Sequence, residues 1–514
     1  MQLIKRNTNK HSITMSLFLW ISLPLILLYL LHKTTKPPKT LPPGPPRLPL
    51  IGNLHQFLFA GDLPTYLWKL SKKHGPIIHL KLGSISAIVV SSPKLSKQVL
   101  KIQDSSFCSR PTFLGQQKLS YNNMDMGFSP YGDYWREMRK MTSIHLLSAG
   151  KIQSFRPIRE EEVSLMMAKI GKICDGEREG GVVDLSEMAL SLGSSLICRI
   201  AFGRGHEDEE SKKERRFGEI LREAQGVLAS LCVSDFFPWL SWVDRLNGYR
   251  DWIDATYEKL DVFYQEIIDD HLDPKRKNEN EEEEDIVDIL IKLKEEKSLS
   301  VDINIKALLV NIFTGATDTS AAATVWVMTA LMKAPQIMNK LQQEIRNLAG
   351  KKGRVDEDDL PQLPYLKAVI NETFRLHPPV PLLMRQAMQR CTLQGYQIEP
   401  KTVIYVNTWA VARDPDYWED PDKFVPERFL DIDTDVVTGQ DFGFLPFGAG
   451  RRMCPASLMG LVNVELAVAN LVYCFDWEMP KGMKVKDIDV ESLPGITVHK
   501  KIPLLLVPTR SGLA

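Results

Sequence analysis

The sequence predicts a mainly α-helical protein with a small β portion. Segments whose apolar residues recur with the period of a helix dominate the chain, whereas strand-like runs are few and short. One segment, Ile305–Lys333, is apolar nearly all round, which is typical of a helix buried in a large core or in a membrane. Because no proline- or glycine-rich linker divides residues 54–514, we predict a single large domain there, behind an N-terminal membrane segment.

Residues 1–32 are predicted to contain a transmembrane anchor. The run Ser12–Leu31 carries no charge and is long enough to cross a bilayer as a helix. A signal peptide is the alternative, but its apolar region is normally shorter and ends at a small-residue cleavage site. Basic residues between positions 33 and 39 favour a cytosolic body, and those between 5 and 10 oppose it unless translation starts at Met15.

Residues 33–53 are predicted to form a basic, proline-rich hinge. The stretch "LPPGPPRLPLIGN" cannot continue a helix, because each proline fixes φ and lacks an N–H donor. Its position directly after the apolar run favours a stiff spacer that holds the body off the membrane. A plain linker between two soluble domains is the alternative.

Periodicity assigns the elements of the body in order along the chain. Runs rich in β-branched residues predict strands at 77–83, 87–92, 402–409 and 502–508. Helical periods predict helices at 134–147, 286–297, 305–333, 335–350 and 363–379. The acidic run at 273–285 is interpreted as a solvated surface loop.

The totals narrow the class of protein. The 64 basic residues balance 64 acidic ones, so the net charge gives no reason to expect a nucleic-acid partner. The seven cysteines are scattered and none stands in a CxxC pair, which argues against a zinc site or a disulfide framework. A reducing compartment fits this cysteine usage better.

One cysteine stands in unusual surroundings, the stretch "FLPFGAGRRMCPASLMG". A helix is predicted to begin just past Cys454, and the free N–H groups of a helix start favour negative charge. Arg451 and Arg452 add positive field, so we expect a thiol pKa lowered toward the thiolate. The preceding glycines would let the backbone approach something flat and bulky. A buried structural cysteine is the alternative.

A second unusual feature lies inside the apolar helix predicted at 305–333. Asp318 and Thr319 interrupt it within "NIFTGATDTSAAAT", and burying an unpaired charge is costly. Gly315 and the neighbouring hydroxyls are expected to open the helical hydrogen bonds. The functional interpretation is a water-holding notch that passes protons. The alternative is a kink solvated by its own hydroxyls.

Two helical pairs carry weaker signals. Glu372 and Arg375 are three residues apart and so lie on one helix face, where an exposed ion pair is the simplest interpretation. Trp135 and Arg139 are four apart and also share a face. Alone, a core tryptophan beside a surface arginine explains them equally well.

Together these motifs resemble the cytochromes P-450. The haem-binding pattern Phe-x-x-Gly-x-Arg-x-Cys-x-Gly is matched at Phe447, Gly450, Arg452 and Cys454, with Ala456 in place of the last glycine. The acid-threonine pattern of the family is matched at Asp318 and Thr319, although the usual Ala-Gly order is inverted at Gly315 and Ala316.

The resemblance implies a cytochrome P450 fold for residues 54–514, a haem-thiolate monooxygenase domain, and a role for each matched residue. Cys454 would be the axial ligand of the iron of haem b, with Phe447 shielding the sulfur, and Asp318 and Thr319 would relay protons. The implied haem-propionate partners are Trp135, Arg139, Arg452 and Arg385; the implied structural triad is Glu372, Arg375 and Arg428; the implied substrate contacts are Ala316, Val380, Leu382 and Ile496.

The resemblance also implies a function. The enzyme would use O2 and electrons from NADPH, delivered by NADPH–cytochrome P450 reductase, to oxidise a small lipophilic plant metabolite such as an aldoxime, a terpenoid or a phenolic. It would be a single-pass protein of the endoplasmic reticulum membrane with a cytosolic catalytic domain, so the sequon at Asn371 should carry no glycan. Stretches such as "SRPTFLGQQKLSY" lean toward the plant branch that includes aldoxime oxidases. A haem-dependent isomerase or dehydratase that needs no external electrons, and a non-catalytic membrane haem protein, are the alternatives.

Overall fold

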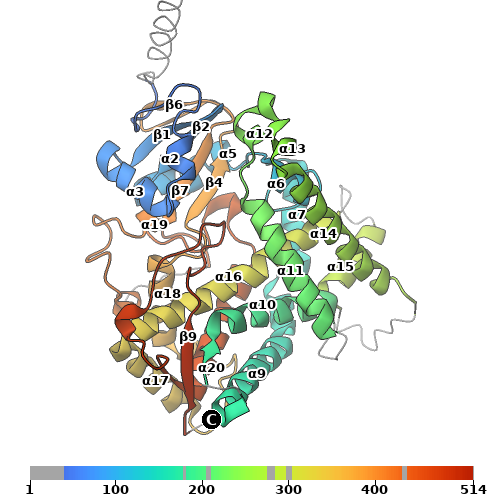
Figure 1. Ribbon diagram of the computed structural model, residues 1–514, viewed down its shortest axis with the longest axis vertical. Coiled ribbons are helices and arrows are strands. Elements are labelled where there is room, and N and C mark those ends of the chain that lie inside the picture. Colours follow the sequence, from blue (N-terminus) through green and yellow to red (C-terminus); the bar gives the residue numbers. More distant parts are fainter. Residues whose placement is uncertain are drawn as a thin grey trace, which may run out of the picture.

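The computed structural model describes residues 40–177, 181–203, 210–274, 284–296, 304–430 and 437–512. The predicted anchor and the first part of the predicted hinge, residues 1–39, lie outside the described residues, and the boundaries at 32/33 and 53/54 stay predictions. The long helix α16 (Ile305–Lys333) crosses the middle of the molecule. The largest sheet lies at one end of the molecule, and α9, α17 and α20 lie toward the other end (Figure 1).

The described strands form three small sheets. The largest has the order β1-β2-β7-β4, with β2 and β7 parallel and the two outer pairs antiparallel. The others have the orders β3-β9-β8 and β5-β6. The strands are β1 (Ile77–Leu82), β2 (Ile85–Val90), β3 (Val183–Asp184), β4 (Leu382–Gln386), β5 (Cys391–Leu393), β6 (Tyr396–Ile398), β7 (Val403–Asn407), β8 (Phe475–Glu478) and β9 (Leu505–Arg510). The four predicted strands correspond to β1, β2, β7 and β9, whereas β4 was not predicted.

Helices make up most of the described chain, as the periodicity predicts. In order they are α2 (Leu54–Leu58), α3 (Leu63–His74), α4 (Pro93–Lys97), α5 (Asp104–Phe107), α6 (Leu114–Leu119), α7 (Asp133–Met141), α8 (Ala149–Ser154), α9 (Arg156–Lys172), α10 (Leu185–Phe202), α11 (Glu210–Ala229), α12 (Val233–Phe236), α13 (Val243–Leu246), α14 (Tyr249–His271), α15 (Ile286–Glu295), α16 (Ile305–Lys333), α17 (Pro335–Ala349), α18 (Pro364–Leu376), α19 (Thr408–Val411) and α20 (Ser457–Cys474). The predicted helix at 134–147 is shorter than expected, because α7 ends at Met141 and a π-helical turn follows at Thr142–Leu146.

Helix α16 is buried along most of its length and continues without a break through Gly315. The expected opening of its hydrogen bonds is not seen. Thr314 and Thr319 instead donate to the carbonyl oxygens of Val310 and Gly315, each at 2.6 Å, so their hydroxyls bond to the previous helical turn. The side of α16 at Thr317 packs closely on α10, since a Cβ at Gly193 would lie 2.7 Å from the Thr317 carbonyl oxygen.

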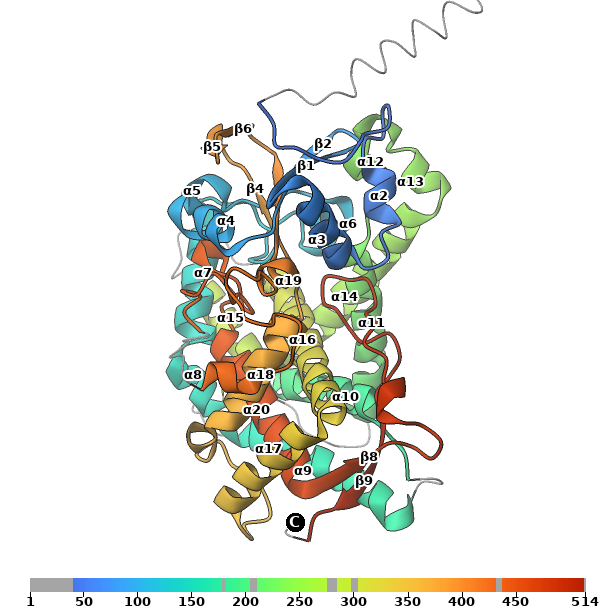
Figure 2. The ribbon, with the colours of Figure 1, turned by 90° about the vertical axis from the view of Figure 1, so that its left-hand side faces the viewer.

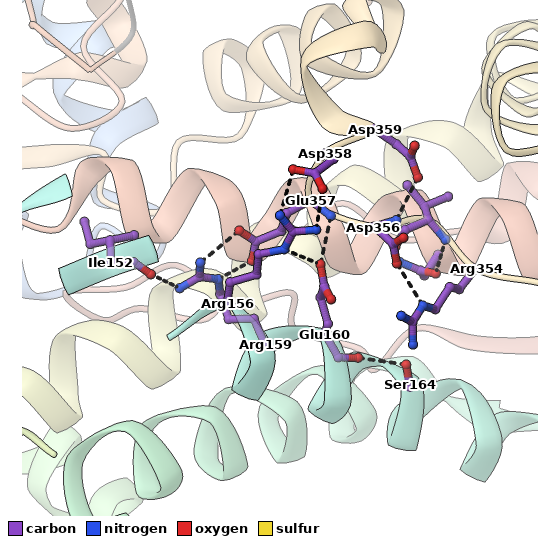
Figure 3. Close-up of polar contacts among 12 residues, drawn as sticks. Ile152, Arg156, Arg159, Glu160, Ser164, Arg354, Asp356, Glu357, Asp358 and Asp359 are labelled. Atoms are coloured by element: carbon purple, nitrogen blue, oxygen red, sulfur yellow. Dashed lines mark hydrogen bonds and ion pairs between the residues drawn. The ribbon is translucent and has the colours of Figure 1, made fainter. Parts of the chain in front are cut away.

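An ion-pair network ties α9 to the segment before α18 (Figure 3). The buried guanidinium of Arg159 binds both carboxylate oxygens of Glu357, at 2.5 and 2.9 Å. Arg156 binds Asp358 in the same two-point manner and also reaches Glu160. Paired guanidinium and carboxylate groups fix both distance and orientation, so this network positions α9 against the rest of the core.

Two described helices are apolar and long enough to span a membrane, α10 and α20. Both lie largely inside the protein core, and 78% of α20 is buried there. Their composition is therefore explained by the core, as is that of α16.

Candidate functional site

A cavity of about 570 Å³ lies beside α16 and collects most of the predicted site residues. Most of its walls come from α7, α11, α16, the segment that leads into β4, the loop before α20, the first turns of α20 and the loop at 493–499. The lining is mostly apolar. The predicted site residues that line it are Trp135, Arg139, Ala316, Asp318, Thr319, Val380, Arg385, Phe447, Arg452, Cys454 and Ile496.

Leu382 is the exception among the predicted substrate contacts. It packs against the sheet core beneath β1 and β2, and Leu383 lines the cavity in its place. Successive side chains of a strand point to opposite faces. Because β4 begins at Leu382, the alternation turns Leu383 and Arg385 toward the cavity. The prediction for Leu382 is corrected to Leu383.

This correction predicts different effects for two otherwise matched substitutions. Leu383→Ala should change the dissociation constant of phenylimidazole, an apolar haem ligand, by about threefold or more, because it removes a cavity wall. Leu382→Ala should leave that constant within about twofold and mainly destabilise the fold, by about 2 kcal/mol. Soret-band titration and thermal unfolding measure the two effects. Equal changes in binding for both variants would contradict the assignment of Leu383, and not Leu382, to the cavity face of β4.

The loop before α20 holds Cys454 at the cavity wall through backbone geometry. Gly448 and Gly450 both have φ of 73°, a region that glycine adopts without strain. A Cβ at Gly450 would also overlap the carbonyl oxygen of Leu100, so this position has no room for a side chain. Gly450 thus packs against the backbone at Leu100 and does not line the cavity. The N–H of Cys454 donates to the Phe447 carbonyl oxygen at 3.0 Å.

The thiol of Cys454 differs from expectation in its electrostatics. Burial raises its pKa, against the smaller lowering effects of the Ala456 backbone N–H and of Arg139. The sequence-based expectation of a lowered thiol pKa is therefore wrong for the protein by itself, since enclosure outweighs the helix start. A bound cation would reverse this balance, because a coordinating thiol is deprotonated.

Arginines crowd one side of the cavity without enough facing anions. Burial, then the neighbouring charges of Arg110 and Arg452, lowers the pKa of Arg385 well below its usual value. The pKa of Arg452 is likewise lowered to about 9 and that of Arg110 to about 10, in each case mainly by burial. The Nε of Arg385 is buried without a hydrogen-bond partner among the described residues. This set fits a group that brings carboxylates into an apolar cavity, as haem does.

The other predicted propionate donors already have protein partners. Trp135 Nε1 donates to the Met126 carbonyl oxygen at 2.9 Å, and its ring lies 4.2 Å beneath the guanidinium of Arg452. Arg452 donates to the carbonyl oxygens of three loop residues, and Arg139 donates to that of Met453 at 2.7 Å. Their roles toward haem stay predictions, and Arg385 is the one among them with an unpaired buried nitrogen.

Arg110 was missed by sequence reasoning. It lines the cavity and donates to the carbonyl oxygens of Gly127 and Met384. The only signal was a basic residue in the quoted stretch "SRPTFLG", which has no periodicity that would place it in a cavity.

The acid of α16 has a partner that the sequence did not indicate. His499 Nε2 lies 2.6 Å from Asp318 Oδ1, across 181 residues of sequence. Beside Asp318, Thr319 lines the same cavity. A Cβ at Gly315 would meet nothing within 4 Å, so the helix leaves open space there for a bound group.

The predicted triad is assembled away from the cavity. Glu372 and Arg375 are fully buried and joined by two hydrogen bonds of 2.6 and 2.9 Å, and Arg428 Nε reaches Glu372 at 3.1 Å. Arg375 also donates to the carbonyl oxygens of Ala412, Pro421 and Lys423. These contacts fix the segment that leads from β7 toward the Cys454 loop. The simple alternative of an exposed pair does not hold.

A helical domain that encloses an apolar cavity, with one thiol in its wall and a cluster of arginines at its side, defines a protein built around a large anionic cofactor. The cytochrome P450 family model matches residues 42–507. The chain therefore belongs to the cytochrome P450 family; it is a cytochrome P450 monooxygenase, and its cofactor is haem.

Relatives and a solved structure agree with this assignment. The chain is 45% identical to 6,7,8-trihydroxycoumarin synthase of Pastinaca sativa, over 96% of this chain and 98% of that protein. It is 44% identical to 5-OH-xanthotoxin synthase of Ammi majus (96% and 97%) and to strychnine-11-hydroxylase of Strychnos nux-vomica (91% and 91%). A zebra fish cytochrome P450, solved with abiraterone, matches 87% of this chain and 99% of that chain with a TM-score of 0.71 at 23% identity, which supports the fold alone.

Proposed function

We propose that this chain is a haem-thiolate monooxygenase that oxidises a small lipophilic plant metabolite with O2 and with electrons from NADPH, delivered by NADPH–cytochrome P450 reductase. The observation that carries the proposal is the joint position of Cys454, the arginine cluster and the Asp318–Thr319 pair around one apolar cavity. The fit of the site to haem supports it: Arg385 has a buried unpaired nitrogen, and Gly315 leaves open space.

Different residues would bind the haem iron, bind the haem propionates and transfer protons. Haem, when bound, supplies the iron chemistry that activates oxygen. Cys454 Sγ would ligate the iron, and Arg385, Arg452 and Arg139 would hold the propionates, with the ring of Trp135 packed against Arg452. Asp318 Oδ1 and Thr319 Oγ1 would hold and pass protons. The apolar lining excludes water and keeps the cavity in a low dielectric, where these charges act most strongly.

The cavity wall supports a small, largely apolar substrate. Ala316, Val380, Leu383 and Ile496 present aliphatic surface to it, and a small-molecule site of this kind binds mainly through apolar contact with a few polar groups for orientation. By their names, two of the relatives above form 6,7,8-trihydroxycoumarin and 5-OH-xanthotoxin, and the third hydroxylates strychnine. We therefore propose that the substrate is a coumarin-like or other polycyclic plant metabolite. That the substrate is an aldoxime, as the sequence resemblance suggested, stays a prediction.

An exposed apolar surface supports attachment to the endoplasmic reticulum membrane, in addition to the predicted anchor. Leu50, Phe59, Trp239, Trp242 and Leu246 are all exposed. The turn between β1 and β2 links their two segments, since the Gly83 N–H donates to the Ile51 carbonyl oxygen at 3.1 Å and the Ser84 N–H donates to that of Phe236 at 2.8 Å. Figure 2 shows α2, α12 and α13 gathered at the end of the molecule that carries β1 and β2. Exposed apolar patches of this kind mark interaction surfaces, and aromatic residues favour the membrane interface.

The test is a turnover assay of the full chain with a plant reductase, NADPH and a panel of coumarins and alkaloids under ¹⁸O2. The proposal predicts product that needs both NADPH and reductase and carries one ¹⁸O atom. Product formed without NADPH, or without ¹⁸O, would favour the isomerase or dehydratase alternative and overturn the proposal. The same assay with heat-treated enzyme provides the background.

A further inference from the structure

We propose that His499 is the residue through which Asp318 exchanges its proton with solvent, so that the relay of this enzyme has three side chains. The inference rests on the proposed function and deepens it. Its basis is the 2.6 Å contact of His499 Nε2 with Asp318 Oδ1, which links the cavity-wall loop at 493–499 to α16.

Exposure differs along this contact in the direction that a relay needs. The side chain of Asp318 is 7% exposed, whereas that of His499 is 28% exposed. A buried carboxylate at the active cavity therefore has a more open partner that carries protons. Imidazole suits this task because it can give a proton from one ring nitrogen and receive one at the other.

The loop that carries His499 is held in place from both sides. The Val498 N–H donates to the Pro379 carbonyl oxygen, and the Val498 carbonyl oxygen accepts from Trp326 Nε1 of α16, each at 2.9 Å. The Leu493 N–H donates to the His499 carbonyl oxygen at 2.8 Å. These bonds fix the backbone on either side of the imidazole. The contact with Asp318 is thus part of a rigid wall, which a positioned proton-transfer group requires.

The proton balance of the reaction sets the task. Each turnover converts RH, O2, NADPH and H⁺ into ROH, H2O and NADP⁺, and two protons must reach the oxygen that leaves as water. Thr319 and Asp318 line the cavity, but the carboxyl group of Asp318 can give a second proton only after another has replaced the first. In the proposed step the neutral ring, protonated at Nε2, gives that proton to Asp318 Oδ1 while Nδ1 receives a proton from a hydronium ion of the solvent, which leaves as water. Exchange with solvent then removes the proton from Nδ1 and restores one at Nε2, so that the ring is ready for the second transfer. No electron moves in this step.

A purely structural role is the competing explanation, since the same contact also ties the loop to α16. A glutamine at position 499 distinguishes the proton-transfer role from the structural role. The side-chain amide introduced by His499→Gln keeps an N–H donor for Asp318 but cannot carry a proton from solvent. Lys501→Gln is the matched control: it removes a basic group from the same segment, where Lys501 pairs with Glu491 at 2.7 Å on the exposed side.

The experiment compares wild type, H499Q, D318N, the double variant and K501Q as full-length, haem-loaded enzymes with reductase, NADPH and coumarin as the probe substrate. We expect H499Q to form product about 100-fold more slowly, at the lower end of the range for a lost acid–base group. More of the NADPH consumed should then yield hydrogen peroxide. The solvent deuterium isotope effect on product formation by H499Q should be larger than that of wild type. The coumarin dissociation constant from Soret titration and the unfolding temperature should stay near those of wild type. K501Q should match wild type throughout.

The double variant tests whether His499 acts through Asp318. It should be no slower than D318N alone, because residues of one relay are not additive. A double variant whose loss of rate equals the product of the two single losses would overturn the inference. So would an H499Q enzyme whose rate, hydrogen peroxide yield and isotope effect are those of wild type. So would an H499Q loss confined to coumarin binding or to stability. A wild-type enzyme without NADPH-dependent product would instead overturn the proposed function, so the two failures are distinguishable.

Discussion

Glu372→Ala is expected to destabilise the folded state by about 3–5 kcal/mol. The substitution leaves Arg375 fully buried without its carboxylate, because both oxygens of Glu372 bind that guanidinium. Arg428 loses the same partner. A buried charge stripped of its counter-ion carries the full cost of desolvation, unlike a pair in water. Urea unfolding followed by tryptophan fluorescence measures the loss, and the yield of haem-loaded protein should fall with it.

Glu399→Ala is the matched control for that experiment. Glu399 pairs with Arg390 at 3.0 Å, but both side chains are more than half exposed. Such a pair contributes about 0–1 kcal/mol, so the unfolding free energy should hardly change. A Glu372→Ala protein as stable as the Glu399→Ala protein would show that the triad does not hold the core together.

Cys454→Ala is expected to reduce NADPH-dependent product formation to the uncatalysed background. The reason is chemical: alanine has no sulfur to ligate iron, and thiolate donation to iron is what favours O–O cleavage. The fold should persist, because the surrounding loop is fixed by the positive-φ glycines and by the Phe447 carbonyl contact, which involves the backbone of residue 454. Circular dichroism checks the fold and the turnover assay checks the activity.

Cys474→Ala is the control for this substitution. Cys474 is buried at the far end of α20, the helix that begins just after Cys454. Its replacement removes a sulfur that does not line the cavity, and it should lower stability slightly without affecting product formation. Equal activity losses for both cysteines would show that Cys454 has no special role.

Local patterns in the sequence were enough to place several parts of this molecule. The apolar period of residues 305–333 predicts α16 with its observed ends, and the glycine-arginine-cysteine pattern predicts a thiol at the start of a buried helix. Residues three apart share a helix face, so the contact between Glu372 and Arg375 followed from spacing.

Other features depend on contacts that no local pattern encodes. His499 meets Asp318 across 181 residues, and nothing in "GITVHKK" indicates that pairing. The phase of β4 depends on pairing with β7, where Arg385 lies opposite Ile404, and a five-residue strand has too few positions to fix its phase by sequence. The raised pKa of Cys454 results from enclosure by distant segments, which outweighs the local helix start.

The most direct test of the central claim is the carbon-monoxide difference spectrum of the reduced, full-length protein. The account predicts the red-shifted Soret band of a thiolate-ligated haem in wild type and in Cys474→Ala, and its loss in a folded Cys454→Ala protein. A folded, haem-loaded wild-type protein without that band, or a Cys454→Ala protein that retains it, would contradict the assignment of Cys454 as the iron ligand.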